Sequence, residues 1–305
     1  MSQAVDSEKE SMGGQPSLSA LNVARCRAVA AHDPREAIRG PDTLAEVFLG
    51  EEAQQSLINP AVHALILQKL AAASPGGYEY FIARTAYLDE VVERALREDI
   101  PQIVFLGAGY DTRAFRFADL IQGTQIFELD VPATQAHKRA LLAEAGLAAP
   151  AGLTYVPIDF NRESLPEKLS EAGYAADEKT LFIWEGVSYY LPAQTVDGVL
   201  RFVREGSAAG SVLCLDYMLT PGEDEASRFG ATQSREAMRA MYTDEPLFFD
   251  LAPEAVESFF AARGFTVAEH LSTAVLEARY LTLPDGTLAG RMLDLFGLAQ
   301  VVVEE

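Results

Sequence analysis

The spacing of hydrophobic positions changes near residue 100 of this 305-residue chain. Between Leu18 and Leu96 apolar residues recur three and four positions apart, a spacing that predicts helices. The clearest of these helices are Leu18–Ala31, Ala61–Ala73 and Tyr78–Leu96. From Gln102 onward short apolar runs alternate with helical stretches, so the second region predicts a different kind of structure.

Seven short apolar runs in the second region are candidate strands. They are Ile103–Leu106, Gln125–Leu129, Thr154–Pro157, Leu181–Trp184, Ser211–Asp216, Thr266–His270 and Gln300–Val303. The helices expected between them are Pro132–Ala145, Ser164–Ala172, Ala193–Gly206 and Pro253–Arg263. Strands that alternate with helices are typical of βαβ units, whose helices cover both faces of a parallel sheet. The pattern therefore predicts an α/β fold with a mostly parallel seven-stranded sheet.

These patterns divide the chain into three parts: a polar, disordered tail (1–16), an N-terminal helical cap (17–98) and an α/β core (99–305). One polar stretch, Glu223–Tyr242, interrupts the strand–helix rhythm after the fifth predicted strand. A ligand site on such a sheet lies at the carboxyl ends of the strands. We therefore expect residues 220–250 to form a helical lid insertion over the site.

The run Ile103–Arg116, with the sequence IVFLGAGYDTRAFR, contains the strongest chemical signal. A buried strand is followed by the turn Gly107-Ala108-Gly109, whose glycines allow the backbone to approach a ligand closely. The next strand ends at Asp130, 23 positions after Gly107. An acidic residue at about this distance holds ribose hydroxyls in nucleotide-binding folds, so the sequence predicts a nucleoside site.

Thr112 occupies the position of the third glycine in the dinucleotide fingerprint. That glycine permits close helix–strand packing beneath a pyrophosphate, so its absence disfavours NAD and favours a nucleoside without phosphates. S-adenosyl-L-methionine (SAM) is such a ligand. An NAD(P)-binding oxidoreductase remains an alternative, and so does a SAM-binding scaffold or sensor without catalytic activity.

Composition excludes several classes of partner. The formal net charge is −21, and no cluster of Lys and Arg is present, which argues against nucleic acid and anionic membrane surfaces. Cys26 and Cys214 are the only cysteines, too few for a disulfide framework, and no ligand spacing suggests a metal. The polar start has no signal-peptide core, and no apolar stretch is long enough to span a membrane. We expect a cytoplasmic protein, either a monomer or a homodimer.

Several motifs occur together in a fixed order: GGYEYFIARTAYLDE, FLGAGYDTRAFR, FELDVPATQAHK, VPIDF and FIWEGVSYYL. With them the chain resembles the leucine carboxyl methyltransferase-like superfamily of SAM-dependent methyltransferases over residues 18–303. Within it, the chain more closely resembles the bacterial branch of small-molecule, polyketide-type O-methyltransferases. The resemblance implies a Rossmann-like class I methyltransferase fold and SAM as cofactor.

The resemblance also implies a set of cofactor contacts. They are Arg84 for the methionine carboxylate, Gly107, Ala108 and Gly109 beneath the methionine portion, Asp130 for the ribose hydroxyls, Asp159 and Phe160 for adenine, and Glu185 near the amino group. A guanidinium suits a carboxylate because it binds in a bidentate fork. Tyr190 falls at the family's tyrosine position, and Arg27 lies where the family often has a basic residue.

Some of these residues have alternative roles. Glu128 lies two positions before Asp130 on the same strand face, so both carboxylates compete for the ribose role, and we favour Asp130. Asp111 and Asp159 could instead cap backbone N–H groups of the segments that follow them. Glu185 follows a buried run, where an acidic group needs a partner.

The candidate catalytic residues are Tyr189, Tyr190 and His137. A tyrosine hydroxyl could orient the methyl acceptor, although aromatic residues beside a strand end more often line a core or pocket. His137 is the histidine nearest a cofactor motif, and a general base must reach the proton of the acceptor. A carboxylate acceptor would need no base, whereas an alcohol or phenol would, so both acceptor types remain open.

We therefore expect a SAM-dependent O-methyltransferase whose acceptor is a hydroxyl or carboxyl oxygen of a small molecule, in polyketide or other secondary metabolism. The first alternative is a carboxyl methyltransferase that acts on a protein C-terminus. That alternative is weakened because residues 223–242 do not match the substrate-side insertion of the enzymes that methylate protein phosphatases.

Overall fold

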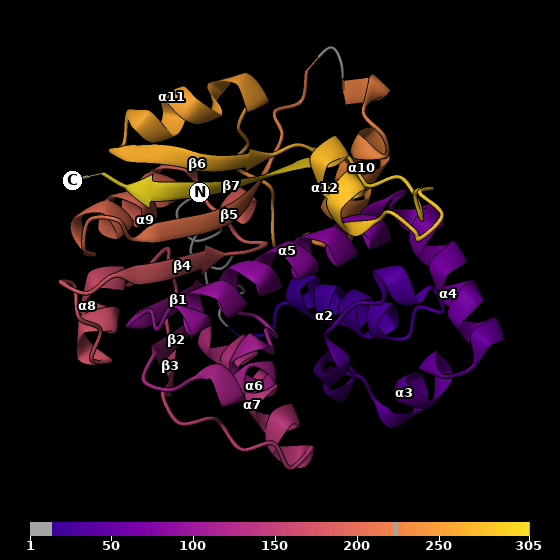
Figure 1. Cartoon of the computed structure of the whole chain (residues 1–305), viewed down its shortest axis with the longest axis horizontal. Helices are drawn as coiled ribbons and strands as arrows, with labels where there is room; N and C mark the ends of the chain where they lie inside the picture. The colour runs from indigo at the N-terminus through magenta and orange to yellow at the C-terminus, as the bar shows by residue number, and fades with distance from the viewer. Residues whose placement is uncertain (1–13, 223–224, 305) are drawn as a thin grey trace, which may run out of the picture.

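A seven-stranded sheet forms the centre of the computed structural model, which describes residues 14–222 and 225–304 (Figure 1). The strands are β1 (Gln102–Leu106), β2 (Gln125–Asp130), β3 (Leu153–Pro157), β4 (Thr180–Trp184), β5 (Val212–Met218), β6 (Phe265–Leu271) and β7 (Phe296–Val303). Their order in the sheet is β3-β2-β1-β4-β5-β7-β6, and β7 runs in the opposite direction to the other six strands. The predicted α/β fold with its mostly parallel sheet is confirmed.

The α-helices in the described part of the chain are α2 (Leu18–Ala31), α3 (Glu51–Leu57), α4 (Pro60–Ala73), α5 (Gly77–Arg97), α6 (Arg113–Arg116), α7 (Pro132–Glu144), α8 (Leu165–Glu171), α9 (Ala193–Glu205), α10 (Ala231–Met241), α11 (Val256–Ala261) and α12 (Thr273–Tyr280). The sequence did not predict α12. The helix expected at Pro253–Arg263 is shorter, because residues 253–255 form a 3-10 turn before α11.

Each face of the sheet is covered by its own hydrophobic core, as expected for parallel strands. Successive residues of β1 point to opposite faces, so Ile103 packs in one core and Val104 in the other. The first core also contains residues of α5 and α12, and the second contains residues of α8, α9 and α11. Burial on both faces explains why the parallel strands appear as continuous apolar runs rather than alternating ones.

The N-terminal helices pack on the same core as the sheet. Ala28 and Val29 of α2 belong to the core that β1 and α5 share. Figure 1 shows α2, α3 and α4 gathered at one end of the sheet, with α5 crossing its face. The predicted cap boundary at residue 98 thus falls at the end of α5. Of the predicted tail, residues 1–13 lie outside the described residues, and residues 14–16 line the cavity described below.

The segment after β5, predicted as a lid insertion, packs against the N-terminal helices. Its helix α10 begins after Gly230, which has a left-handed backbone with φ of 71°. A Cβ atom at Gly230 would lie 2.2 Å from the carbonyl oxygen of Pro75, so glycine is required for this close approach. The hydroxyls of Ser74 and Ser234 lie 2.7 Å apart at the same contact. Residues 223–224 of the insertion lie outside the described residues.

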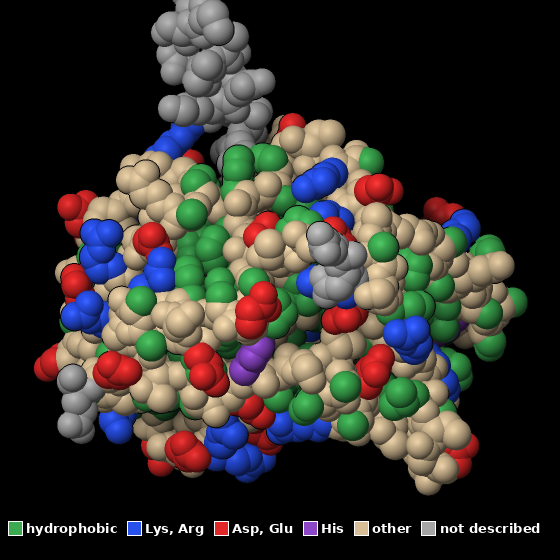
Figure 2. Space-filling model, turned by 90° about the horizontal axis from the view of Figure 1, so that it is seen from above, with side chains coloured by type: hydrophobic (Ala, Val, Ile, Leu, Met, Phe, Trp, Pro, Cys, Tyr) green, Lys and Arg blue, Asp and Glu red, His purple; other side chains and the backbone are tan. Residues whose placement is uncertain are grey.

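On the face shown in Figure 2, Lys and Arg side chains lie among acidic ones and form no continuous basic area. In the part of the chain that the structure describes, no helix combines the length and the apolar character needed to cross a bilayer.

Two glycines provide a matched test of the packing of the sheet. A Cβ atom at Gly297 of β7 would lie 2.4 Å from the ring of Tyr217, which is fully buried. We expect Gly297→Ala to lower the free energy of unfolding by about 1–3 kcal/mol, because the buried ring must move. Gly198 in α9 has open space around its Cβ position, so Gly198→Ala should instead stabilise by roughly 0.5–1 kcal/mol.

Urea unfolding of the two variants checks this expectation. Equal midpoints for Gly297→Ala and the wild type would contradict the packing of Gly297 against Tyr217.

Candidate functional site

A cavity of about 570 Å³ lies at the carboxyl ends of β1 to β4. Its remaining walls come from the start of α2 and from residues 241–245, which follow α10. The predicted site residues that line it are Arg84, Gly107, Ala108, Gly109, Asp130, Asp159, Phe160, Glu185, Tyr189 and Tyr190. The structure thus brings together residues that are far apart in the sequence. His137 is the one predicted site residue that does not line this cavity.

The glycine turn after β1 is tied to β2. Gly107 and Gly109 have φ values of 77° and 51°, which are strained for other residues. A Cβ atom at Gly107 would lie 2.5 Å from a methyl group of Val187, so this position also lacks room for a side chain. The Ala108 N–H donates to the Leu129 carbonyl at 2.7 Å. The backbone of this turn therefore lies directly at the cavity, with no side chain on Gly107 or Gly109 to cover it.

The two carboxylates of β2 have different environments. Glu128 is buried beside Lys138, with 2.6 Å between its Oε2 and the lysine Nζ, and it does not line the cavity. Asp130 lines the cavity and accepts hydrogen bonds from the N–H groups of Gly109, at 2.5 Å, and Val131, at 2.7 Å. Burial raises the pKa of Asp130 to about 6, although the two N–H groups favour its charged form. Of the two carboxylates, only Asp130 is available to a ligand.

The cap interactions considered for Asp159 and Asp111 are both present. Asp159 Oδ1 accepts a hydrogen bond from the Asn161 N–H at 3.0 Å. Asp111 Oδ1 accepts one from the Arg113 N–H at 2.6 Å, and its second oxygen pairs with the Arg113 guanidinium. Since both carboxylates also line the cavity, capping fixes their position without removing them from the site.

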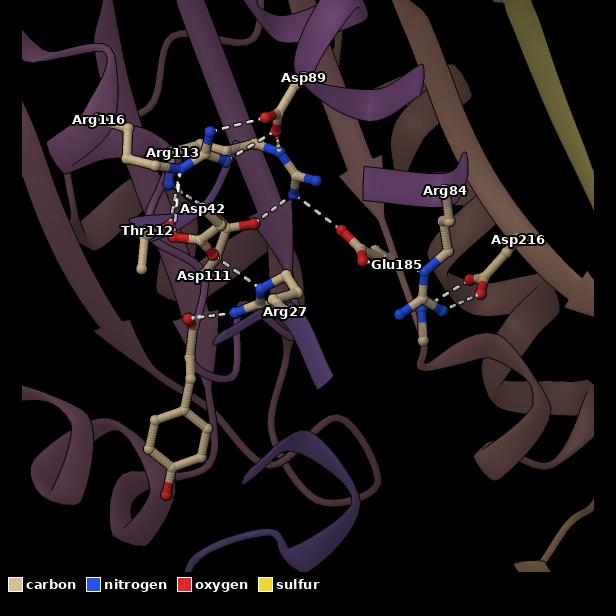
Figure 3. Close-up of polar contacts among 12 residues, drawn as sticks. Arg27, Asp42, Arg84, Asp89, Asp111, Thr112, Arg113, Arg116, Glu185 and Asp216 are labelled. Atoms are coloured by element: carbon tan, nitrogen blue, oxygen red, sulfur yellow. Dashed lines mark hydrogen bonds and ion pairs between the residues drawn. The ribbon is translucent and has the colours of Figure 1, made fainter. Parts of the chain in front are cut away.

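Glu185 lies between two buried arginines (Figure 3). Its Oε2 is 2.8 Å from Nη1 of Arg113, and its Oε1 is 3.0 Å from Nε of Arg84. Burial alone would raise the pKa of Glu185, but the charges of Arg113 and Arg84 outweigh burial and lower that pKa to about 2. Oε1 forms no aligned hydrogen bond within the described chain and keeps acceptor capacity.

Asp216 completes this part of the site and was not identified from the sequence. It lies fully buried in β5, and its Oδ2 is 2.6 Å from Nη1 of Arg84. The same oxygen accepts a hydrogen bond from the Tyr80 hydroxyl at 2.8 Å, and Oδ1 accepts one from the Gly186 N–H at 2.6 Å. Asp216 thus fixes both Arg84 and the turn after β4.

The ion pairs continue from Glu185 toward the N-terminal helices (Figure 3). Arg113 and Arg116 both bind the carboxylate of Asp89 in α5, at 2.7 and 2.6 Å. Arg116 also approaches Asp42 at 3.4 Å, and Asp42 binds Nε of Arg27 in α2 at 2.8 Å. We call this set the ion-pair network: Arg27, Asp42, Arg84, Asp89, Asp111, Arg113, Arg116, Glu185 and Asp216.

The three candidate catalytic residues occupy different positions. Tyr189 is buried against Phe296, with ring centroids 5.1 Å apart, whereas Tyr190 is half-buried in the cavity wall. Burial raises the pKa of both tyrosines, so their hydroxyls are protonated donors at neutral pH. His137 does not line the cavity, but its Nδ1 lies 2.6 Å from the hydroxyl of Tyr110, which does.

Comparison with known proteins identifies similar sequences. A family model described as leucine carboxyl methyltransferase matches residues 20–204. A proposed SAM-dependent methyltransferase of Streptomyces coelicolor is 35% identical over 200 residues, which are 65% of this chain and 68% of that protein. A similarly named protein of Bacillus subtilis is 32% identical over 63% of this chain and 62% of its own length. The chain spans about two thirds of the length of these curated relatives.

Solved structures share the fold across nearly the whole chain. A proposed methyltransferase from Thermobifida fusca superimposes with a TM-score of 0.58 and 19% identity, covering 95% of this chain and 96% of that one. A DUF574 family protein from Streptomyces avermitilis gives a TM-score of 0.59 and 13% identity, covering 92% and 96%. At these identities the comparison establishes the Rossmann-like fold alone.

The position of Glu185 predicts a pH-dependent contribution to stability. Its folded pKa of about 2 lies below the ordinary value of 4.5, so its ionised form stabilises the fold above pH 4.5. That contribution disappears as the pH falls from 4.5 toward 2. Glu185→Gln should therefore be less stable than the wild type near pH 6, and the difference should shrink as the pH is lowered.

Urea unfolding at several pH values tests this, with Glu144→Gln at an exposed position of α7 as the control. A difference between Glu185→Gln and the wild type that stays constant with pH would show that Glu185 is not held ionised by the arginines.

Proposed function

Because residues 20–204 match the family model, this chain belongs to the leucine carboxyl methyltransferase family, and we propose that it methylates an oxygen atom of a small molecule. SAM is its cofactor, and its activity is that of a SAM-dependent methyltransferase. This assignment excludes the NAD(P)-dependent oxidoreductase considered from the sequence. The acceptor and the residues that act on it are proposals, as follows.

The charge of the cavity suits SAM. Six carboxylates and two arginines line it: Asp111, Asp130, Asp159, Glu185, Asp244, Glu245, Arg27 and Arg84. SAM carries a sulfonium and an ammonium against one carboxylate, so its net positive charge complements this negative wall. The buried Oε1 of Glu185, which lacks an aligned donor in the described chain, is available to the ammonium.

The other cofactor roles follow the same chemistry. We assign Asp130 to the ribose hydroxyls, because it lines the cavity while Glu128 is paired with Lys138. We assign Asp159 to the adenine amine and Phe160 to the ring, and Arg84 to the methionine carboxylate. The glycine turn at residues 107–109 leaves space for the chain of the amino acid to pass.

Bound SAM supplies a methyl group on positively charged sulfur, which is already activated for transfer. The protein then has to hold the acceptor oxygen in line with this group and exclude water. The side chains of Leu18, Val23 and Met241 give the far side of the cavity an apolar wall. The protonated hydroxyl of Tyr190 is a donor that can orient the acceptor. We propose that Tyr189, which is buried against Phe296, holds the cavity wall next to Tyr190 in place. His137 has no role in the proposed mechanism, because it does not line the cavity.

The apolar and aromatic residues that line this cavity beside its charged groups are the observation that favours a small acceptor. We place that acceptor among polyketides or other secondary metabolites. The family description itself favours a second candidate, a carboxyl methyltransferase that acts on a protein C-terminus. The two candidates differ in where the methyl group is found after the reaction.

Transfer from radiolabelled SAM in a cell lysate separates these candidates. The proposed function predicts label in the organic extract, dependent on the added enzyme. Label confined to a protein band would support the protein C-terminal acceptor and contradict the small-molecule acceptor.

Replacement of Asp130 tests the cofactor site. Asp130→Ala should weaken the binding of SAM more than about tenfold, because the ribose hydroxyls lose a charged acceptor. Asp119→Ala removes an exposed carboxylate outside the cavity and should leave the affinity unchanged. Calorimetric titration measures both, and wild-type affinity in Asp130→Ala would contradict the assignment.

A further inference from the structure

One carboxylate oxygen in the cavity wall lacks a hydrogen-bond donor. Glu245 follows α10, and its Oε1 accepts a hydrogen bond from the Ser17 hydroxyl at 2.6 Å. Its Oε2 is buried and forms no hydrogen bond within the described residues. A buried hydrogen-bond acceptor that lacks a donor lowers the stability of the protein by about 1–3 kcal/mol, and by more when it is charged. A ligand that brings an O–H group to this oxygen would remove that cost.

The contacts of Ser17 hold Glu245 at the cavity. The Ser17 hydroxyl also caps α2 by accepting a hydrogen bond from the Ala20 N–H at 3.1 Å. The Ser17 N–H donates to the hydroxyl of Thr134 in α7 at 2.9 Å. The Glu245 N–H closes a turn on the Tyr242 carbonyl at 3.0 Å. Glu245 is therefore placed by two helices and a turn.

Glu245 lines the cavity together with Tyr190 and Tyr242, and its charge also acts on Asp130. Burial raises the pKa values of Tyr190 and Tyr242, and the charge of Glu245 contributes to both rises. Since these hydroxyls stay protonated, they can donate hydrogen bonds but cannot take a proton at neutral pH. A proton acceptor beside these tyrosines must be another group.

The other carboxylates of the wall have partners or lie elsewhere. Asp111 and Glu185 are paired with Arg113, and Asp130 receives two backbone N–H groups. Asp244 is exposed. Glu185 and Glu245 are the two wall carboxylates with a buried oxygen that lacks a donor in the described chain, and since two arginines hold Glu185, Glu245 is the remaining one.

We propose that Glu245 is the catalytic base for a hydroxyl acceptor, an alcohol or phenol, an inference that rests on the proposed methyl transfer. The acceptor O–H donates its hydrogen bond to Oε2 of Glu245. A lone pair of the acceptor oxygen forms the new O–CH₃ bond, and the S–CH₃ bond breaks with its electron pair left on sulfur. The hydroxyl proton passes to Glu245. The products are a methyl ether, S-adenosylhomocysteine and a protonated Glu245.

The same arrangement disfavours a carboxylate acceptor. The two arginines of the cavity wall are committed elsewhere: Arg27 pairs with Asp42, and Arg84, held by Glu185 and Asp216, is assigned to the carboxylate of the cofactor. A carboxylate placed beside Glu245 would meet a like charge without a compensating cation. A hydroxyl group meets no such repulsion and supplies the missing donor.

2-Naphthol can test this directly, because it becomes a strong acid when excited and emits as naphtholate where a base or water takes its proton. The emission of the bound probe is measured after that of the free probe in water is subtracted. We expect naphtholate emission from 2-naphthol bound to wild-type protein saturated with S-adenosylhomocysteine. Glu245→Gln should reduce the naphtholate fraction of the bound probe at least about fivefold, since an amide is a very weak base. Glu245→Asp, which keeps a carboxylate, should restore part of it. Glu236→Gln removes an exposed charge from α10 and should leave the naphtholate fraction of the bound probe unchanged.

Two results would overturn the inference. One is undiminished naphtholate emission in Glu245→Gln, which would assign the proton to another group. The other is a loss of more than about tenfold in the affinity of Glu245→Gln for S-adenosylhomocysteine, which would place Glu245 on the cofactor. Failure of the wild type to bind S-adenosylhomocysteine would instead contradict the proposed function, so the two failures are distinguishable.

Discussion

The buried ion-pair network joins the N-terminal helices to the carboxyl ends of the strands. Arg27 contributes from α2, Arg84 from α5 and Arg113 from α6, and the carboxylates between them come from both regions. Removing one member of such a buried pair costs about 3–5 kcal/mol, because an uncompensated charge stays inside the protein. The helical cap and the sheet therefore have to assemble together.

This network also determines the shape of the site. Glu185 and Asp111 are members of the network and line the cavity, so the charges that hold the fold together also face the ligand. Asp216 fixes the turn after β4 through the Gly186 N–H and holds Arg84 in place. A rigid, negatively charged wall is suited to a cationic cofactor, because no charged group has to reorganise when it binds. In the mechanism that we propose, Tyr190 and Glu245 of the cavity wall meet the acceptor.

Local patterns predicted the parallel strands well, because burial on both faces makes each of them a continuous apolar run. They predicted β7 too short, from Gln300 instead of Phe296, because Gly297 interrupts the apolar run. That glycine is needed where the ring of Tyr217 packs against it. Helix α12 was missed because Leu276 is the single fully buried residue that it contributes.

The residues that line the cavity were predictable where they belong to a short motif, and their roles stay predictions. The glycine turn, Asp130 and Glu185 each follow a recognisable strand, and they line one cavity. Asp216 could have been found by the argument used for Glu185, since an acidic group inside a buried run also needs a partner. Arg113 and Glu245 could not, because their roles depend on partners distant in the sequence. The contact between Glu245 and Ser17 joins residues 228 positions apart.

Every role assigned to the cavity residues requires that an adenosyl ligand binds in this cavity. Calorimetric titration of the wild-type protein with S-adenosylhomocysteine, with NAD and NADP as controls, measures it without knowledge of the acceptor. Binding of the adenosyl ligand at micromolar concentration, about −8 kcal/mol, with no binding of either dinucleotide, is the predicted result. Binding of NAD, or no binding of the adenosyl ligand, would contradict the assignment of the site.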